Sequence, residues 1–401
     1  MVKMAYLHEV ADVFNGKTPA KSDQRSQGFP VLKIRDVDQY GNFKGLHESF
    51  VEDSFAAKFR TKCVQPGDTL VLNAAHNADY VGSKVFFARE SVANTLPTGE
   101  WLLVRAKETI LHPGYINYWL RCDRTRKAIR FLVKGIHLYP KDVAMLQLPI
   151  PPFEEQERIV DLLSRAEGIV KLRREAQGKA AALIPAIFLE MFGDPRWNPK
   201  GWPTLPLNEV SEVISGVAKG RQLSGDDLIE LPYMRVGNVK DGHLDLSEVK
   251  TMEIKRSEVE KLRIERGDLL MTEGGDPDKL GRAALWCGEI DLCVHQNHIF
   301  KVRSNSALLV PEYLRSLASS AYGKAYFLRV AKKTTGIASI NKTQLSAFPV
   351  VLPPLGLQAR FKQWVEAVES ILAQQVSASA TAQATFDSVL ASHFRSNKDD
   401  K

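Results

Sequence analysis

The chain has 401 residues, which is enough for two or three domains. Hydrophobic residues make up 44% of it and charged residues 25%, a balance that supports hydrophobic cores and excludes a disordered chain. No run of 18 or more apolar residues occurs and the N-terminus does not resemble a signal peptide, so we expect a soluble, cytoplasmic protein. The net charge of +7 mildly favours a polyanionic partner.

The chain offers few groups for metal binding or disulfide formation. Its cysteines form no C-x-x-C pair, which argues against a zinc site and against a disulfide framework. His295 and His298 have no partners at metal-ligand spacing, so we expect no metal. The cysteines are Cys63, Cys122, Cys287 and Cys293.

The first 150 residues predict a domain of short strands and turns. The alternation of apolar and polar residues in VLKIRDV, at 31–37, predicts a strand. The pair Gly67-Asp68 is a turn signal that leads into the apolar strand TLVL. A strand at 85–87, a helical stretch at 114–132 and a basic loop around Gly135 are expected to follow.

Residues 151–194 predict one long helix. The two prolines at its start block a helix upstream, and acidic residues fill its first turn, where they suit the helix dipole. Pro185 lies inside the pattern and predicts a kink. About 38 residues at about 1.5 Å each make a rod of roughly 55 Å. Its apolar seam consists of Ile159, Leu162, Leu163, Ala166, Ile169, Val170, Ala176, Ala180, Leu183, Ile187 and Phe188.

The second half repeats the first at an offset of about 200 residues. Residues 7–16 align with 207–216, and the Gly–Asp turn recurs at Gly267-Asp268 before the apolar strand LLMT. A linker rich in proline and glycine, at 193–203, marks the boundary between the halves. Because the matches form an ordered series, they predict two copies of one domain.

The C-terminal segment repeats the long helix. The double proline and the glutamine recur at Pro353, Pro354 and Gln358, and an apolar stripe follows. Two such helices can lie antiparallel and bury each other's stripes. The expected fold class is therefore α+β, with two repeated α/β domains separated by two long antiparallel, coiled-coil-like helices. The expected boundaries are 1–150, 151–194, 195–352 and 353–401.

These features resemble the specificity subunits of type I restriction–modification systems. The resemblance is carried by the apolar strand, double proline and glutamine at 148–156, by EMFGDP at 190–195 and by the counterpart at 350–358. It covers essentially the full chain, and the order, spacing and repetition of the motifs make it specific. Pro185, Gly356 and the polar run from Gln374 depart from the family's pattern and bear on the local geometry of the helices.

The resemblance implies target recognition domains at 1–150 and 195–352, each reading one half of a bipartite site in double-stranded DNA. The spacer helices at 151–194 and 353–401 would set the gap and dock two methyltransferase subunits, which restriction subunits would join. The chain would carry no chemistry, so S-adenosylmethionine, ATP and Mg are expected only on partner subunits. The expected partner-binding residues are Phe153, Gln156, Phe188, Gln358, Trp364 and Phe394, of which the aromatic ones are equally consistent with plain core.

Reading DNA requires donors and acceptors aimed at base edges, with cations near phosphates. Both halves carry such groups on predicted loops, and the loops at 134–135 and 332–336 recur at one place in the repeat. Positions that match between the two halves can equally serve to stabilise the fold. Loops that differ between the halves are therefore better candidates for base specificity. The candidates are Lys33, Arg35, Asn73, His76, Asn77, Lys84, Lys134, His137, Lys141, Arg235, Asn238, Lys279, Arg282, Gln296, Asn297, His298, Lys332, Lys333, Thr334, Thr335 and Lys342.

Two other functions stay open at this point. A self-sufficient DNA methyltransferase needs an Asn/Asp-Pro-Pro-Tyr/Phe loop, but the nearest sequence, at 150–153, has Ile at the amide position. No Walker A pattern is present, and the acidic turn at 274–279 is a weak nuclease signal that we interpret as a tight polar turn. Asp36 and Asp68 are interpreted as turn or cap residues. The second alternative is a stand-alone DNA-binding regulator.

Overall fold

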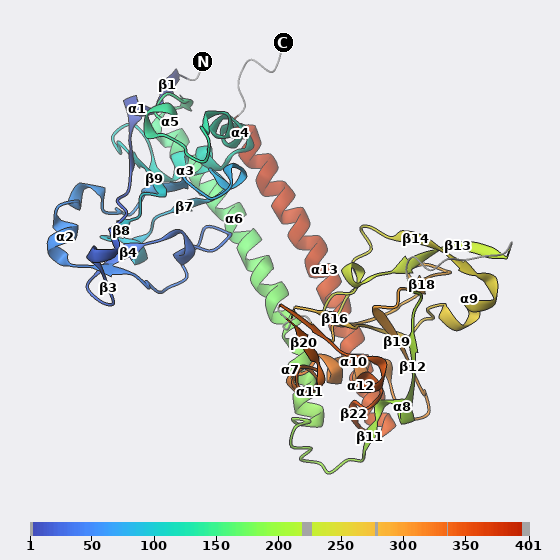
Figure 1. Ribbon diagram of the computed structural model, residues 1–401. Helices are drawn as coiled ribbons and strands as arrows, with labels where there is room; N and C mark the ends of the chain where they lie inside the picture. The colour runs from blue at the N-terminus through green and yellow to red at the C-terminus, as the bar shows by residue number, and fades with distance from the viewer. Residues whose placement is uncertain (1–2, 219–226, 277–279, 335, 395–401) are drawn as a thin grey trace. The chain divides into compact units, whose positions relative to one another are not determined.

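The computed structural model describes residues 3–218, 227–276, 280–334 and 336–394 (Figure 1). It divides into two compact units, Met1–Arg174 with Ser377–Lys401 and Glu175–Val376, which we call the first and second units. Each unit contains a globular α/β part and a stretch of both long helices. The expected mixed fold, with two repeated domains and two long helices, is confirmed. The four segment boundaries stay a prediction, because the division into units cuts both long helices.

The first unit is built on a four-stranded antiparallel sheet with the order β2–β9–β6–β7. A short β1–β10 ladder pairs the first strand of the unit with the strand that precedes the long helix α6. A smaller sheet, β3–β5–β4–β8, lies beside the main one. The elements are β1 (Lys3–Tyr6), α1 (Leu7–Val10), β2 (Ala11–Asn15), β3 (Gln24–Arg25), β4 (Phe29–Leu32), β5 (Phe50–Val51), α2 (Asp53–Ala57), β6 (Thr69–Leu72), β7 (Val85–Phe87), β8 (Leu96–Pro97), β9 (Trp101–Ala106), α3 (Pro113–Arg121), α4 (Asp123–Leu132), α5 (Pro140–Val143), β10 (Gln147–Ile150) and α6 (Phe153–Ala181).

The second unit has the same plan. Its four-stranded sheet has the order β12–β19–β15–β17, and β11 pairs with β22 ahead of the last helix. Two three-stranded sheets, β14–β13–β18 and β16–β21–β20, complete it. The elements are α7 (Leu183–Phe192), β11 (Thr204–Pro206), α8 (Leu207–Val210), β12 (Ser211–Ser215), β13 (Leu228–Met234), β14 (Lys250–Lys255), α9 (Arg256–Leu262), β15 (Leu269–Thr272), β16 (Gly274–Gly275), β17 (Ala283–Leu285), β18 (Val294–His295), β19 (Ile299–Ser304), α10 (Pro311–Ser319), α11 (Ala321–Val330), β20 (Lys332–Thr334), β21 (Ile337–Ser339), α12 (Lys342–Ser346), β22 (Pro349–Val351) and α13 (Leu355–His393).

The central strand of each main sheet is buried on both faces. In β9, Leu102 and Val104 face the core formed with α3, α6 and α13, whereas Trp101 and Leu103 face a second core. This division follows from the two-residue period of a strand. In the second unit, Phe300 and the neighbouring Val302 of β19 face the core that contains α10 and both long helices. Each globular part is therefore fixed to its own stretch of the helix pair by hydrophobic packing.

The strand register confirms the internal repeat. Val104 pairs with Val13 on one side and with Thr69 on the other. At the corresponding place in the second unit, Val302 pairs with Val213 and with Leu269. The two registers are the same, although the offset has changed from 200 at β2 and β12 to 198 at β9 and β19.

The Gly–Asp turns have a structural role in both units. Gly67 and Gly267 have φ of +91° and +94°, values that favour glycine. The carboxylate of Asp68 is buried and accepts a hydrogen bond from the backbone N–H of Gln65 at 2.8 Å and a bidentate pair from Arg105. The interpretation of Asp68 as a turn residue is confirmed.

The long helix at 153–192 is interrupted where the proline lies. α6 ends at Ala181 and α7 begins at Leu183. Pro185 has no N–H to donate to the carbonyl of Ala181, and its ring crowds that carbonyl. The hydrogen bonds on either side persist, from Ala182 N to Gly178 O and from Ala186 N to Ala182 O. The predicted kink is thus a one-residue break in the helix.

The apolar seam of the long helices is narrower than expected. Ile159, Leu163 and Val170 of α6 are buried in one hydrophobic cluster of the first unit, together with side chains of α3 and with Phe386 and Leu390 of α13. A pair of helices covers only a narrow stripe of each surface. Three other large apolar side chains of the predicted seam are exposed: Leu162, Ile169 and Leu183. Phe188 is buried and Ile187 is half-buried, both at the core of the second unit.

Candidate nucleic-acid interface

In the first unit, three loops meet at one end of the main sheet. Asn73, in the loop after β6, donates its backbone N–H to the carbonyl of Glu100, in the β8–β9 loop, at 2.9 Å. The carbonyl of Asn73 accepts from Leu138 N at 2.7 Å, which attaches the basic loop at 133–139. The structure therefore brings together candidates that are far apart in the sequence: His76 and Asn77 on one loop, Lys134 and His137 on another.

The second unit assembles the corresponding loops by the same hydrogen bonds. Glu273 N donates to the carbonyl of His298 at 2.9 Å, and Ile340 N donates to the carbonyl of Glu273 at 2.8 Å. Gln296 and Asn297 belong to the same β18–β19 loop as His298. His298 Nδ1 lies 2.5 Å from Glu273 Oε2, so this exposed imidazole is already oriented by a carboxylate.

A basic hairpin adjoins this cluster in the second unit. β20 carries exposed Lys332 and Lys333 and pairs with β21, which also pairs with β16. Gly336, with φ of +83°, lies in the connection. The counterpart in the first unit is a shorter turn around Gly135, in which the backbones of Lys134 and His137 pair as an isolated antiparallel β-bridge. Thr334 is the last residue of β20, whereas Lys279 and Thr335 lie outside the described residues.

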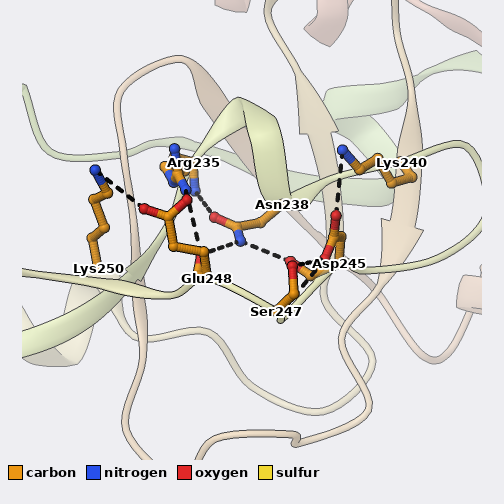
Figure 2. A network of polar contacts seen from close by, with 7 residues as sticks. All are labelled: Arg235, Asn238, Lys240, Asp245, Ser247, Glu248 and Lys250. Carbon is orange, nitrogen blue, oxygen red and sulfur yellow. Dashed lines mark hydrogen bonds and ion pairs between the residues drawn. The ribbon is translucent and has the colours of Figure 1, made fainter. Parts of the chain in front are cut away.

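A second polar cluster holds the 235–250 loop of the second unit (Figure 2). The Asn238 amide is buried and donates from Nδ2 to the carbonyls of Asp245 at 2.7 Å and Glu248 at 3.0 Å. Arg235 forms an ion pair with Glu248 at 2.6 Å, and its hydrogen bond lowers the pKa of that carboxyl. Lys250 lies 3.3 Å from the same carboxylate. Asn238 is therefore engaged in holding its own loop and presents little to a ligand.

Two candidates of the first unit are also engaged internally. Asn73 is buried and donates from Nδ2 to Oδ1 of Asn15 at 2.8 Å. Lys84 donates to the carbonyls of Ile34 and Val37 at 3.2 and 2.7 Å, and burial lowers the pKa of its ammonium group. Both side chains hold neighbouring loops in place.

The remaining candidates differ in exposure. Arg35 is exposed and forms an ion pair with Glu48 at 2.9 Å, and Lys134 pairs with Asp142 at 2.6 Å. These are surface pairs, which a phosphate can replace at small cost. The exposed candidates are Arg35, His76, Asn77, Lys134, His137, Lys141, His298, Lys332, Lys333 and Lys342, and the half-buried ones are Lys33, Lys84, Arg235, Arg282, Gln296 and Asn297.

The histidine next to this cluster is part of the core. His295 is fully buried, and its Nδ1 lies 2.8 Å from the carbonyl oxygen of Ile299. Burial lowers its pKa to about 4, so the ring is neutral at pH 7. Among the described residues, no group of three or more His, Cys, Asp or Glu side chains is placed to hold a metal ion.

Comparisons with known proteins identify the family. The model of the type I restriction modification DNA specificity domain matches residues 2–177. The specificity subunit of the type I restriction enzyme EcoKI from Escherichia coli K12 is 23% identical over 393 residues, which are 91% of this chain and 82% of that protein. The StySPI specificity subunit from Salmonella potsdam is 22% identical over 387 residues, 91% and 81% of the two chains. Residues 2–177 therefore match the type I DNA specificity domain, and the chain as a whole resembles type I specificity subunits.

Solved structures agree on the fold. A chain from a structural study of complex assembly and conformational transition in the type I R-M system superposes with a TM-score of 0.58 at 19% identity, covering 98% of both chains. The type I S subunit from M. genitalium gives a TM-score of 0.54 at 12% identity, covering 99% of this chain and 96% of that one. In the described part of this chain, no helix is long and apolar enough to cross a membrane.

The residues expected to bind partner subunits are mostly buried inside this chain. Gln156 is fully buried, where it accepts from His112 N and donates to the carbonyls of Ile110 and Pro151. Gln358 repeats this arrangement in the second unit with Val310 N and the carbonyls of Leu308 and Pro353. Phe188 and Phe394 are also buried, so that of the six only Phe153 and Trp364 expose a large part of the side chain, 38% and 53%.

Sequence reasoning missed two polar side chains of the first unit. Because Val104 corresponds to Val302, Thr98 corresponds to Gln296 and Glu100 to His298. The candidates in the second unit therefore have counterparts, Thr98 and Glu100, that the alignment at offset 200 did not indicate. The alignment of β9 with β19 at offset 198 would have found them.

Proposed function

We propose that the chain selects the DNA sequence for a type I restriction–modification enzyme, with each unit reading one half of a bipartite site. The observation that carries this proposal is the repeat itself. The same loops are assembled by the same backbone hydrogen bonds in both units, yet the side chains differ at matching positions, as with Glu100 and His298. A duplicated scaffold with unlike loop side chains is suited to reading two unlike half-sites.

The exposed cations support a two-part mode of binding. Lysine and arginine contacts to phosphates position a protein on DNA, whereas side chains at the base edges select the sequence. Lys332 and Lys333 are exposed on a strand that pairs with β21, next to the loop that carries Gln296 and His298. The hairpin would contact the backbone and the loop would contact base edges. In the first unit, Lys134 would contact the DNA backbone and the 98–100 loop would contact base edges.

The long helices would set the distance between the two half-sites. α13 has 39 residues and, at about 1.5 Å per residue, a length of roughly 58 Å. A turn of DNA is about 34 Å. The hydrophobic packing of each globular part on its stretch of the helices would make the gap a fixed property of the protein.

The exposed apolar side chains on the helices would dock the partner subunits. Leu162, Ile169 and Leu172 of α6 are 46–66% exposed, and Trp364 and Ile371 of α13 are 53% and 45% exposed. Surfaces of this kind mark protein interfaces. We propose that two methyltransferase subunits bind there and that restriction subunits join through them. The specificity subunit itself would be non-catalytic and without cofactor; S-adenosylmethionine, ATP and Mg would belong to the partners.

Co-expression with the partner methyltransferase subunit, followed by sequencing of methylated positions in the host DNA, tests the proposal. The expected result is one motif made of two short specific halves and a gap of fixed length. A motif without a gap would contradict the proposal. Binding of S-adenosylmethionine by the isolated chain would favour the self-sufficient methyltransferase instead, and purification without any enzyme partner would favour the regulator.

A further inference from the structure

The first unit contains a cleft beside the β8–β9 loop. Its volume is about 370 Å³, and it lies within the first unit alone. Two cationic side chains and two polar side chains of the loop are among the residues that line it. The cationic side chains are Lys33 and Arg35, and the two polar side chains of the loop are Thr98 and Glu100.

Two polar atoms at this cleft lack an internal partner. The Thr98 side chain is 3% exposed, and neither its Oγ1 nor the buried Glu100 Oε2 has a hydrogen-bond partner among the described residues. An unpaired buried carboxylate oxygen is costly, and native proteins pair nearly all such atoms. An ionised carboxylate oxygen can only accept, so Glu100 points to a ligand that supplies a hydrogen-bond donor, and the Thr98 hydroxyl beside the same cleft can donate or accept.

At the positions of Thr98 and Glu100, the two units have the same backbone hydrogen bonds but different side chains. Thr98 N donates to the carbonyl of Leu32, as Gln296 N donates to the carbonyl of Met234. The side chains differ, because Thr98 corresponds to Gln296 and Glu100 corresponds to His298. In the second unit the imidazole of His298 already has a carboxylate partner in Glu273, whereas Glu100 Oε2 has none among the described residues.

We propose that Thr98 and Glu100 are specificity-determining residues of the first unit, where Glu100 accepts a hydrogen bond from the exocyclic amino group of a base in the major groove. This inference rests on the proposed function. Cytosine fits best, because it presents only the N4 amino donor, whereas adenine presents an N7 acceptor next to its amino group. Lys33 and Arg35, which line the same cleft, would lie against the adjoining phosphates.

The test measures methylation rates by the complex of this chain with its methyltransferase subunit. The substrates are duplexes in which each base pair of both half-sites is varied in turn. Glu100→Gln is expected to reduce discrimination at one cytosine-bearing base pair of one half-site by roughly 10- to 100-fold. The other half-site and the gap should be unchanged. His298→Gln should alter the other half-site only, and Glu108→Gln, which changes an exposed carboxylate outside the cleft, should alter neither.

Each outcome decides the inference. Thr98→Val is the second variant: if Glu100→Gln fails to fold, altered discrimination by folded Thr98→Val at one half-site supports the inference. Unchanged discrimination by the folded variants overturns it, as does an effect of Glu100→Gln and His298→Gln on the same half-site. Loss of methyltransferase binding without a change in the recognised sequence also overturns it. Failure of the wild-type complex to methylate any bipartite site contradicts the proposed function, which separates the two failures.

Discussion

Arg303 donates two hydrogen bonds to Asp268, from Nε to Oδ1 and from Nη2 to Oδ2, each at 2.8 Å. The aspartate is 1% exposed at its side chain and the arginine 33%. Arg105 and Asp68 make the same pair in the first unit, at 2.8 and 2.7 Å. Each pair ties the Gly–Asp turn to the central strand of its sheet, so one ion pair fixes the same strand register in both units.

Removal of the guanidinium should destabilise the second unit strongly. Arg303→Met leaves the buried carboxylate of Asp268 without its charged partner, which should cost about 3 kcal/mol of unfolding free energy. Urea unfolding measures the change. Arg165→Met is the matched control, because Arg165 forms an exposed pair with Asp161 on α6 and its loss should have no measurable effect. Equal stability of Arg303→Met and the wild type would show that the pair is not structural.

The buried glutamines should anchor the long helices. Gln156→Ala leaves His112 N and the carbonyls of Ile110 and Pro151 without their partner, which should cost about 2–3 kcal/mol. Hydrogen exchange in the first turn of α6 should become faster. Gln363→Ala, at an exposed position of α13, is the control and should leave exchange unchanged. Protection of the α6 start in the Gln156→Ala variant equal to that of the wild type would contradict the anchoring role.

Stability should fall on acidification because of His295. Its pKa is lowered to about 4 in the folded protein, mainly by burial, against 6.5 for a free imidazole. Above pH 6.5 the ring is neutral in both states and its contribution is constant. As the pH falls from 6.5 toward 4, only the unfolded state takes up the proton, so stability should drop by about 2 kcal/mol between pH 7 and pH 5.

Urea unfolding at the two pH values measures the His295 contribution. His295→Gln removes the titrating group, so its stability should depend less on pH than that of the wild type. His243→Gln is the control, since this histidine is exposed. A pH dependence of His295→Gln identical to the wild type would assign the effect to other groups.

The lysines of the basic hairpin should contribute to the affinity for DNA but not to the choice of the recognised sequence. Lys332→Ala and Lys333→Ala should each weaken DNA binding by the complex and reduce the slope of log K against log salt by about 0.9 per lost phosphate contact. The methylated sequence should stay the same. Lys324→Ala removes an equal charge that pairs with Asp241 and should leave the slope unchanged. A changed recognition sequence in the lysine variants would mean that the hairpin reads bases.

Much of the fold follows from local sequence signals. The Gly–Asp turns, the double prolines before each long helix and Pro185 act through their own backbone chemistry, so their effects were predictable. The repeat was predictable because its signals recur in order. The width of the buried helix stripe was not, because it depends on how much surface one neighbouring helix covers.

The candidate interface was less predictable, for a physical reason. Whether a polar side chain serves the fold or a ligand depends on partners that are remote in sequence. Asn73 is held by Asn15, and Gln156 by backbone groups 44 and 46 residues away. Thr98 and Glu100 were missed because the offset between the copies changes from 200 to 198 before β9, as the strand register shows.

Exchange of one globular part for the other tests whether each unit reads its own half-site. Residues 4–150 would replace 204–352, with the junctions at the matching β1–β10 and β11–β22 ladders. The methylated sites made by this chain with its methyltransferase subunit would then be mapped. If each unit reads its own half-site, the new site should contain the first half-site twice, with a fixed gap. A site that retains the original second half-site would contradict it.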